Sequence, residues 1–115
     1  MKTYKVRVGE SLPDLGLFVR DNGALLAGLA SGYTFALKVG TLDGDLVFTK
    51  SSGIVGQTGA NSPPLGTPNV VIRWATTDEL DQLTPGTFKA QLFITRSSDS
   101  KVRIEEWLIS VAATL

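Results

Sequence analysis

The chain has 115 residues, of which 43% are hydrophobic and 19% charged. This composition is typical of one globular domain spanning residues 1–115 and excludes a disordered chain. Eleven basic and eleven acidic residues cancel, so no long-range positive field gathers nucleic acid, although Arg96, Lys101 and Arg103 could form a local basic group. The absence of cysteine excludes disulfides and thiolate metal sites, and the absence of histidine removes the commonest general base and zinc ligand.

The beginning of the chain has no targeting pattern. Charged residues recur through residues 1–7, so no apolar signal core forms there. No run approaches the roughly 18 apolar residues of a membrane span. We therefore expect synthesis in a host cytoplasm and no membrane partner.

Apolar residues recur at every second position along five segments, which is the pattern of strands with one buried face. In chain order these runs are Tyr4, Val6 and Val8; Leu15, Leu17 and Val19; Tyr33, Phe35, Leu37 and Val39; Val70, Ile72 and Trp74; and Phe88, Ala90, Leu92 and Ile94. Each run predicts a strand.

The last run changes phase. Val102 and Ile104 hold one phase, and after two glutamates Trp107, Ile109 and Val111 hold the other. A bulge near residues 105–106 would turn both sets inward, and this is the interpretation we favour. The alternative is a strand with one half exposed to water.

Turn residues separate the runs at short spacing. Residues 21–23 (DNG), 43–45 (DGD) and 97–100 (SSDS) predict tight connections. Residues 51–68 are rich in Gly, Ser and Pro and predict a long loop, with one short strand around Ile54 and Val55. Thr76 followed by Glu79 resembles a capping box. Together these features predict an all-β sandwich of about 7–8 antiparallel strands, with one short helical turn near residues 77–82.

The order of these features resembles the immunoglobulin-like domain of phage virion proteins, including the N-terminal domain of the phage baseplate upper protein family. The residues that carry the resemblance are YKVRVGE at 4–10 with LPDL at 12–15, DNG at 21–23 with LAGL at 26–29, and WATTDEL at 74–80 with PGTFKAQL at 85–92. The resemblance covers nearly the whole chain, and its specificity lies in the order and spacing of common pieces. It implies an immunoglobulin-like sandwich that assembles with other virion proteins.

Two features depart from that family. Its tyrosine after Pro-Gly is Phe88 here, so a tyrosine corner cannot form at this position, although the ring can fill the same apolar volume. The chain stops at Leu115, just after the last run, with no stalk or receptor-binding module. The resemblance therefore implies an attachment-type domain standing alone.

The acidic residues suggest no catalytic or metal site. Asp78, Glu79 and Asp81 suit a helix N-terminus, where acidic side chains meet unpaired N–H groups, better than a cation or catalytic site. Asp43 and Asp45 suit a hairpin turn better than a calcium site, because the ligand spacing of a calcium loop is absent. No phosphate-binding glycine motif or nucleophile motif occurs. We expect no metal and no cofactor.

The aromatic residues divide into two groups. Trp74 and Trp107 are in phase with apolar neighbours, so we expect them in the core, although exposed they could stack on sugars. Phe18 and Phe93 lie out of phase with the apolar face of their strands. They therefore either pack under loops or form an exposed contact surface.

These observations lead to a hypothesis and its alternatives. The leading one is a non-catalytic bacteriophage virion structural protein, in the tail, baseplate or neck or on the capsid, present in several symmetric copies and localised in the virion. The alternative is a carbohydrate-binding or adhesion module with the same fold. A hydrolase that uses two carboxylates is the enzymatic alternative, but nothing places two such groups across a cleft.

Overall fold

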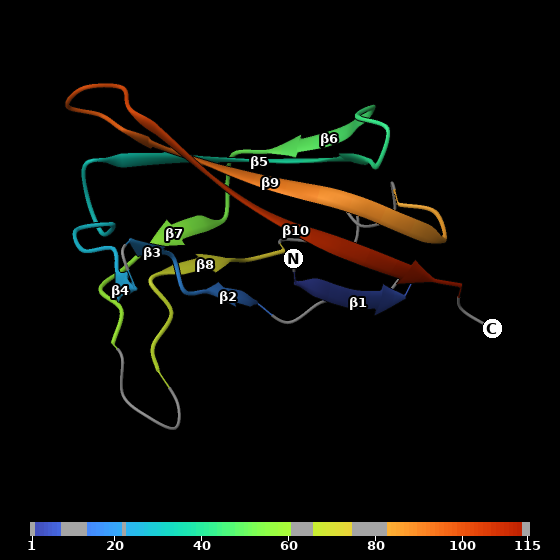
Figure 1. Cartoon of the computed structure of the whole chain (residues 1–115), viewed down its shortest axis with the longest axis horizontal. Coiled ribbons are helices and arrows are strands. Elements are labelled where there is room, and N and C mark those ends of the chain that lie inside the picture. Colours follow the sequence, from blue (N-terminus) through green and yellow to red (C-terminus); the bar gives the residue numbers. More distant parts are fainter. Residues whose placement is uncertain (1, 8–13, 22, 61–65, 75–82, 114–115) are drawn as a thin grey trace.

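A computed structural model describes residues 2–7, 14–21, 23–60, 66–74 and 83–113, and over these residues the chain is all-β (Figure 1). The described strands are β1 (Thr3–Arg7), β2 (Leu15–Leu17), β3 (Arg20–Asp21), β4 (Ala24–Leu25), β5 (Tyr33–Thr41), β6 (Leu46–Lys50), β7 (Ile54–Gly56), β8 (Val70–Ile72), β9 (Gly86–Arg96) and β10 (Val102–Ala112). They outnumber the expected 7–8 because β3 and β4 have two residues each, too short for alternation to reveal. The predicted helical turn near 77–82 lies outside the described residues.

The strands form two main sheets and a small hairpin. The larger sheet has the order β1-β10-β9-β5-β6, the smaller has the order β2-β8-β7, and β3 pairs with β4. Most neighbours are antiparallel, as expected, but β1 runs parallel to β10. The prediction of antiparallel strands throughout is therefore wrong for β1. Parallel strands cannot be joined by a tight turn, and here the chain between β1 and β10 contains all the other strands.

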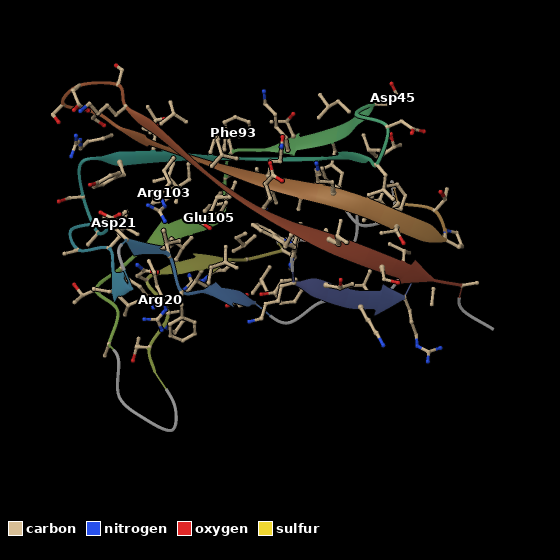
Figure 2. The ribbon with its side chains drawn as sticks, in the orientation of Figure 1. Arg20, Asp21, Asp45, Phe93, Arg103 and Glu105 are labelled. Atoms are coloured by element: carbon tan, nitrogen blue, oxygen red, sulfur yellow. The ribbon has the colours of Figure 1, made fainter. Side chains whose placement is uncertain are left out.

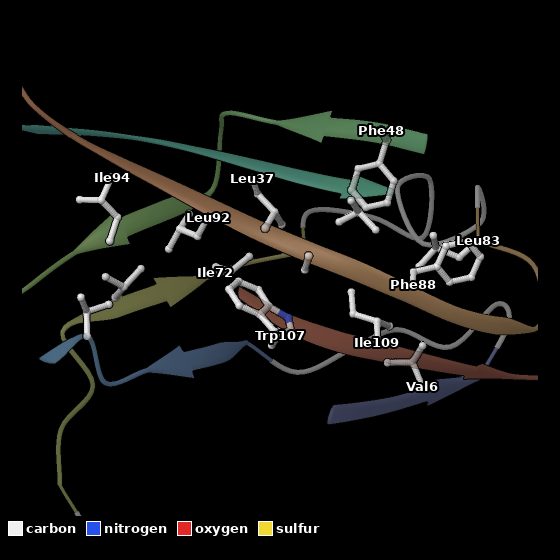
Figure 3. Packing of buried hydrophobic residues seen from close by; sticks show 14 of the residues in the cluster. Val6, Leu37, Phe48, Ile72, Leu83, Phe88, Leu92, Ile94, Trp107 and Ile109 are labelled. Carbon is white, nitrogen blue, oxygen red and sulfur yellow. The ribbon is translucent and has the colours of Figure 1, made fainter. Parts of the chain in front are cut away.

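The core lies between these two sheets (Figure 3). Alternation along β9 buries Phe88, Ala90, Leu92 and Ile94, as predicted. The facing side chains come from β8 and from segments beside it. The buried hydrophobic cluster comprises Val6, Val19, Leu29, Leu37, Val39, Phe48, Val70, Ile72, Leu83, Phe88, Ala90, Leu92, Ile94, Trp107, Ile109 and Val111.

The predicted bulge in β10 is wrong. The β9–β10 register is continuous, from Val102 opposite Thr95 to Val111 opposite Gly86. With an unbroken two-residue period, Val102 and Ile104 face the side opposite Trp107, and they are 54% and 48% exposed. The alternative interpretation, a strand with one half exposed, describes β10.

The charged side chains of β10 explain why no bulge is needed (Figure 2). Arg103 and Glu105 share the phase of Trp107 and therefore turn toward the smaller layer. Arg103 Nε lies 2.8 Å from Glu105 Oε1, and Arg103 Nη1 lies 3.9 Å from Asp21 Oδ1. Arg103 Nη2 also donates to the carbonyl oxygen of Arg20. Because these charges satisfy one another and the β3 backbone, this end of the interface between layers is polar.

Several turn predictions are confirmed. β3 and β4 form a hairpin across residues 21–24, and Gly23 has a φ of 84°, which glycine adopts without strain. The turn from β5 to β6 contains the predicted residues 43–45 and is closed by the Thr41 N–H, which donates to the Asp45 carbonyl at 2.8 Å. The short strand predicted around Ile54 and Val55 is β7. Farther along this segment, Ala60 forms a bridge with Thr67.

A buried asparagine, which the alternation of apolar residues did not reveal, joins β8 to the segments before and after the β3–β4 hairpin. Asn69 has no exposed surface and directly precedes β8. Its Oδ1 accepts from the Val19 N–H at 2.8 Å, and its Nδ2 donates to the carbonyls of Val19 at 2.9 Å and Leu26 at 3.1 Å. These bonds fix the chain on both sides of the β3–β4 hairpin, whose Arg20 and Asp21 contact Arg103.

Candidate contact surfaces

Phe93 belongs to an apolar patch on the outer face of the five-stranded sheet, the face turned away from the core. The strand register places Ile104 and Ala36 directly beside Phe93 on its two neighbouring strands. Val102, one outward position farther along β10, extends this row. We call Ala36, Phe93, Val102 and Ile104 the outer-face patch. Directly opposed side chains contact one another, so these four form one surface.

Phe18 lies on the other layer. It follows β2, between Leu17 and Val19, which pack on or in the core, and its ring is 42% exposed. The guanidinium of Arg20 lies 5.9 Å from the Phe18 ring centroid. Phe93, by contrast, lies on the five-stranded sheet, well away from Arg20 in Figure 2. The structure therefore does not bring the two predicted contact residues together.

Basic side chains lie on the same face as the outer-face patch, and one of them, Lys38, touches it. The Lys38 ammonium lies 4.9 Å from the Phe93 ring centroid, a cation–π contact. Lys89 lies on the same face, as do Lys5 and Arg7, because Tyr4 and Val6 take the core-facing positions of β1. Among the described strand residues this face has one carboxylate, Glu106 of β10. The described strand residues of this face therefore have more basic than acidic side chains, although the whole chain is neutral.

Glu106 is held in place by its neighbours in the sheet. Gln91 lies directly opposite and donates from Nε2 to Glu106 Oε1 at 2.9 Å. Lys89 Nζ lies 3.8 Å from Glu106 Oε2. Because the pair is more than one-third exposed, its contribution to stability is small. Its effect is to neutralise part of the positive charge of this face.

A hollow of about 340 Å³ opens on the same face beside Gly40. Its walls include Leu42 and Leu46, which are 58% and 61% exposed, and Lys38 and Lys89. A Cβ on residue 40 would lie 2.7 Å from the Asp45 carbonyl oxygen, so the close approach of the backbone that leads into β6 requires glycine here. The outer face is thus hollowed where β5 and β6 meet.

A second hollow, of about 360 Å³, lies between β10, β1 and the β2 segment. Its aromatic lining is Tyr4, Trp107 and Phe18, and the rings of Tyr4 and Trp107 meet edge to face at 6.3 Å. Lys2, Glu105 and Glu106 also line it. Glu105 is paired with Arg103, whose Nε lies 2.8 Å from Glu105 Oε1.

The tryptophans are packing residues. Trp107 is 3% exposed, as predicted, and Trp74 is half-buried against the core. Both indole Nε1 atoms are buried and have no hydrogen-bond partner within the described part of the chain. Trp107 is too deeply buried to stack on a sugar, whereas Trp74 is half-buried, and the carbohydrate-binding alternative stays a prediction.

Lys50 is a buried charged residue that the two-residue periodicity of β6 could have predicted. It shares the core-facing phase of Phe48 on β6 and is 2% exposed. Its ammonium lies 5.7 Å from the Trp74 ring centroid. The signal was a lysine two residues beyond a core phenylalanine in the same strand.

The predicted acidic sites divide between described and undescribed parts. Asp78, Glu79 and Asp81 lie outside the described residues. Asp43 and Asp45 are exposed in the β5–β6 turn, where the Asp45 N–H donates to Thr41 Oγ1 at 3.1 Å. No group of three or more metal-binding side chains occurs among the described residues. This arrangement agrees with a hairpin turn.

The basic group near the β9–β10 turn is largely paired. Arg96 Nε and Nη2 donate to the two carboxylate oxygens of Asp99 at 3.0 and 2.6 Å. These hydrogen bonds lower the pKa of Asp99 and raise the pKa of the Arg96 guanidinium. Arg103 pairs with Glu105. The turn therefore offers little uncompensated charge for a phosphate backbone.

Comparison with known proteins identifies no relative of this chain. No helix in the described part of the chain is both long and apolar enough to cross a membrane. No protein-family model matches the sequence, and no curated protein and no solved structure matches it significantly.

Proposed function

We propose that this chain is a non-catalytic, immunoglobulin-like sandwich that binds other proteins through the outer face of its five-stranded sheet. We further propose that it does so as a structural subunit of a bacteriophage virion. The observation that carries the proposal is the outer-face patch, where Val102 and Ile104 are about half exposed beside Phe93.

The order of the strands supports the immunoglobulin-like assignment. In that fold one sheet contains strands C, F and G, extended by C′ in variable-type domains, and the other contains B, E and D. Here β6, β5, β9 and β10 correspond to C′, C, F and G, while β2, β8 and β7 correspond to B, E and D. β1 adds to the edge of β10.

The exposed apolar residues support a docking role. Exposed branched side chains clustered on one face are typical of contact surfaces, whereas single exposed ones are common. Lys38 beside Phe93, with Lys89 on the same face, favours a partner whose surface carries acidic groups next to an apolar centre. The virion context comes from the resemblance in residues 4–15, 21–29 and 74–92.

Particle composition tests the virion context. Mass spectrometry of purified particles from the phage that encodes this chain is expected to detect it in many copies. Particles that lack the chain would refute the virion role while leaving the docking surface untested by that result.

Two matched variants test the docking surface. Ile104→Asp places a charge in the outer-face patch, and Phe18→Asp places one on a similarly exposed apolar residue of the other layer. Both positions are exposed, so both variants should fold, which circular dichroism checks. We expect Ile104→Asp to abolish incorporation into particles and Phe18→Asp to preserve it. Normal incorporation of Ile104→Asp would refute the proposed surface.

A further inference from the structure

The two edges of the five-stranded sheet differ in how they are protected. Within the described residues, β1 ends the sheet on one side and β6 on the other. An edge strand presents unpaired N–H and C=O groups, and natural proteins commonly protect it with charged side chains. β1 has Lys5 and Arg7, both exposed.

β6 lacks this protection. Its sequence is LVFTK, and its one charged residue, Lys50, is turned into the core. A register shift lies at the turn end, between Val39 and Gly40, while Phe48 to Lys50 keep a regular register with β5. Leu46, the first residue of β6, is 61% exposed.

Charge decides what fits against β6. Two outer faces packed together would oppose lysines to lysines, and two β1 edges would oppose Lys5 and Arg7 to their own copies. β2 and β7 have three residues each, too few for a stable pairing. Two β6 strands bring no charged side chains together along their length.

The antiparallel direction also separates the acidic turns. Asp43 and Asp45 precede β6, so in an antiparallel pair they lie at opposite ends of the joined strands. Five residues of strand span roughly 17 Å, which exceeds the distance of about 8–10 Å over which salt screens exposed charges. A parallel pair would place all four carboxylates together.

We propose that a second copy of this chain pairs its β6 with β6 in antiparallel fashion, around a two-fold axis near Phe48. The result is one sheet continuous across both copies, with Leu46 of each copy beside the junction. Both outer faces then lie on the same side of the joined sheet. The pairing goes beyond the docking role proposed above and does not depend on it.

The mass of the full chain in solution tests this pairing. Sedimentation equilibrium should show the mass rising from 12.2 kDa toward twice that value as the chain concentration approaches about 1 mM. Leu46→Lys should keep the mass at one chain, because it places a charge on the edge. Val102→Lys, the same change at a similarly exposed residue of the outer-face patch, should leave the dimer intact. A single-chain mass for the unmodified protein at about 1 mM would overturn the proposal, as would loss of the dimer only in Val102→Lys.

Cross-linking tests which strands meet. The chain has no cysteine, so single-cysteine variants report one site each. Thr49→Cys lies on β6 and is exposed, and near a two-fold axis it should be joined to its copy by a short thiol-specific cross-linker. Ser98→Cys, exposed in the β9–β10 turn, should not be joined. Equal cross-linking of both variants, or of neither in a sample that sediments as a dimer, would overturn the β6 pairing.

Discussion

The two halves of β10 show opposite relations between pattern and burial. From Trp107 onward, the core-facing side chains are Trp107, Ile109 and Val111, all buried. From Val102 to Glu105, the same phase holds Arg103 and Glu105, while the apolar residues face outward. One uninterrupted strand thus has an apolar core-facing half and a polar core-facing half.

The difference follows from what packs against each half. Around Trp107 the neighbouring strand β1 supplies an aromatic contact through Tyr4, and Trp107 belongs to the buried apolar cluster with Ile109 and Val111. Around Arg103 the strand β3 supplies the carboxylate of Asp21 and the carbonyl of Arg20. Apolar side chains point inward only where other apolar side chains cover them. The change of phase of the apolar residues therefore marks the edge of the apolar core and not a distortion of the strand.

The largest expected effect concerns the apolar half of the interface. Phe88→Ala should lower the free energy of unfolding by roughly 3–5 kcal/mol, because the ring is buried between the layers and its removal leaves a cavity. Phe93→Ala, five residues along the same strand on the outer face, should cost about 1 kcal/mol or less. Chemical denaturation of both variants measures the contrast. Equal losses would show that the two faces of β9 are buried alike.

A smaller loss of unfolding free energy is expected when Asn69 is replaced, because its side chain binds the segments before and after the β3–β4 hairpin. Asn69→Ala removes three hydrogen bonds and leaves the Val19 N–H without the acceptor it has here, while the Val19 carbonyl keeps the Leu26 N–H; the change should cost roughly 1–3 kcal/mol. The control is Gln57→Ala, which removes one bond to the Pro68 carbonyl at a partly buried site and should cost about 1 kcal/mol. Denaturant unfolding compares the two. A loss for Asn69→Ala no greater than the control's would mean that water replaces its partners.

The sequence contains enough information to predict most strands but not the surfaces between them. Alternation located β1, β5, β8 and β9 because a two-residue period directly reports which side chains are buried. The prediction for β10 was wrong because it required every apolar residue of the strand to be buried. Whether Val102 is covered depends on strands distant in the sequence. The core-facing position next to it is taken by Arg103, whose partner Asp21 is more than 80 residues away in the chain.

The candidate surfaces were predicted only in part. Phe18 and Phe93 stand out of phase, and the exposure of Phe18 could be expected from that alone. The grouping of Phe93 with Ile104 and Ala36 requires the order β10-β9-β5, which local pattern does not contain. Asn69 gave no signal, because a buried asparagine between a proline and a strand has the sequence of an ordinary loop residue.

A more modest loss is expected in the polar half of β10. Arg103→Met removes the partner of Glu105 and the contacts to β3, while keeping much of the aliphatic side chain. Both charged groups are about one-third exposed, so the loss should be roughly 0.5–1.5 kcal/mol. A double-mutant cycle with Glu105→Gln isolates the pair, and a coupling energy of zero would contradict a structural role for it.

The smallest effect is a pH dependence at the β9–β10 turn. Asp99 has a lowered pKa because Arg96 donates hydrogen bonds to its carboxylate. A carboxylate whose pKa is lower in the folded state stabilises the fold above its unfolded pKa of about 3.9, and this stabilisation is lost as the pH falls through the folded value. The difference in melting temperature between the protein and Asp99→Asn should therefore be present near neutral pH and shrink in strong acid. Arg96→Gln should return the pKa of Asp99 toward its ordinary value, which carboxyl NMR titration measures. An unchanged titration in Arg96→Gln would show that the turn backbone, through the Lys101 N–H at 3.2 Å, holds the carboxylate by itself.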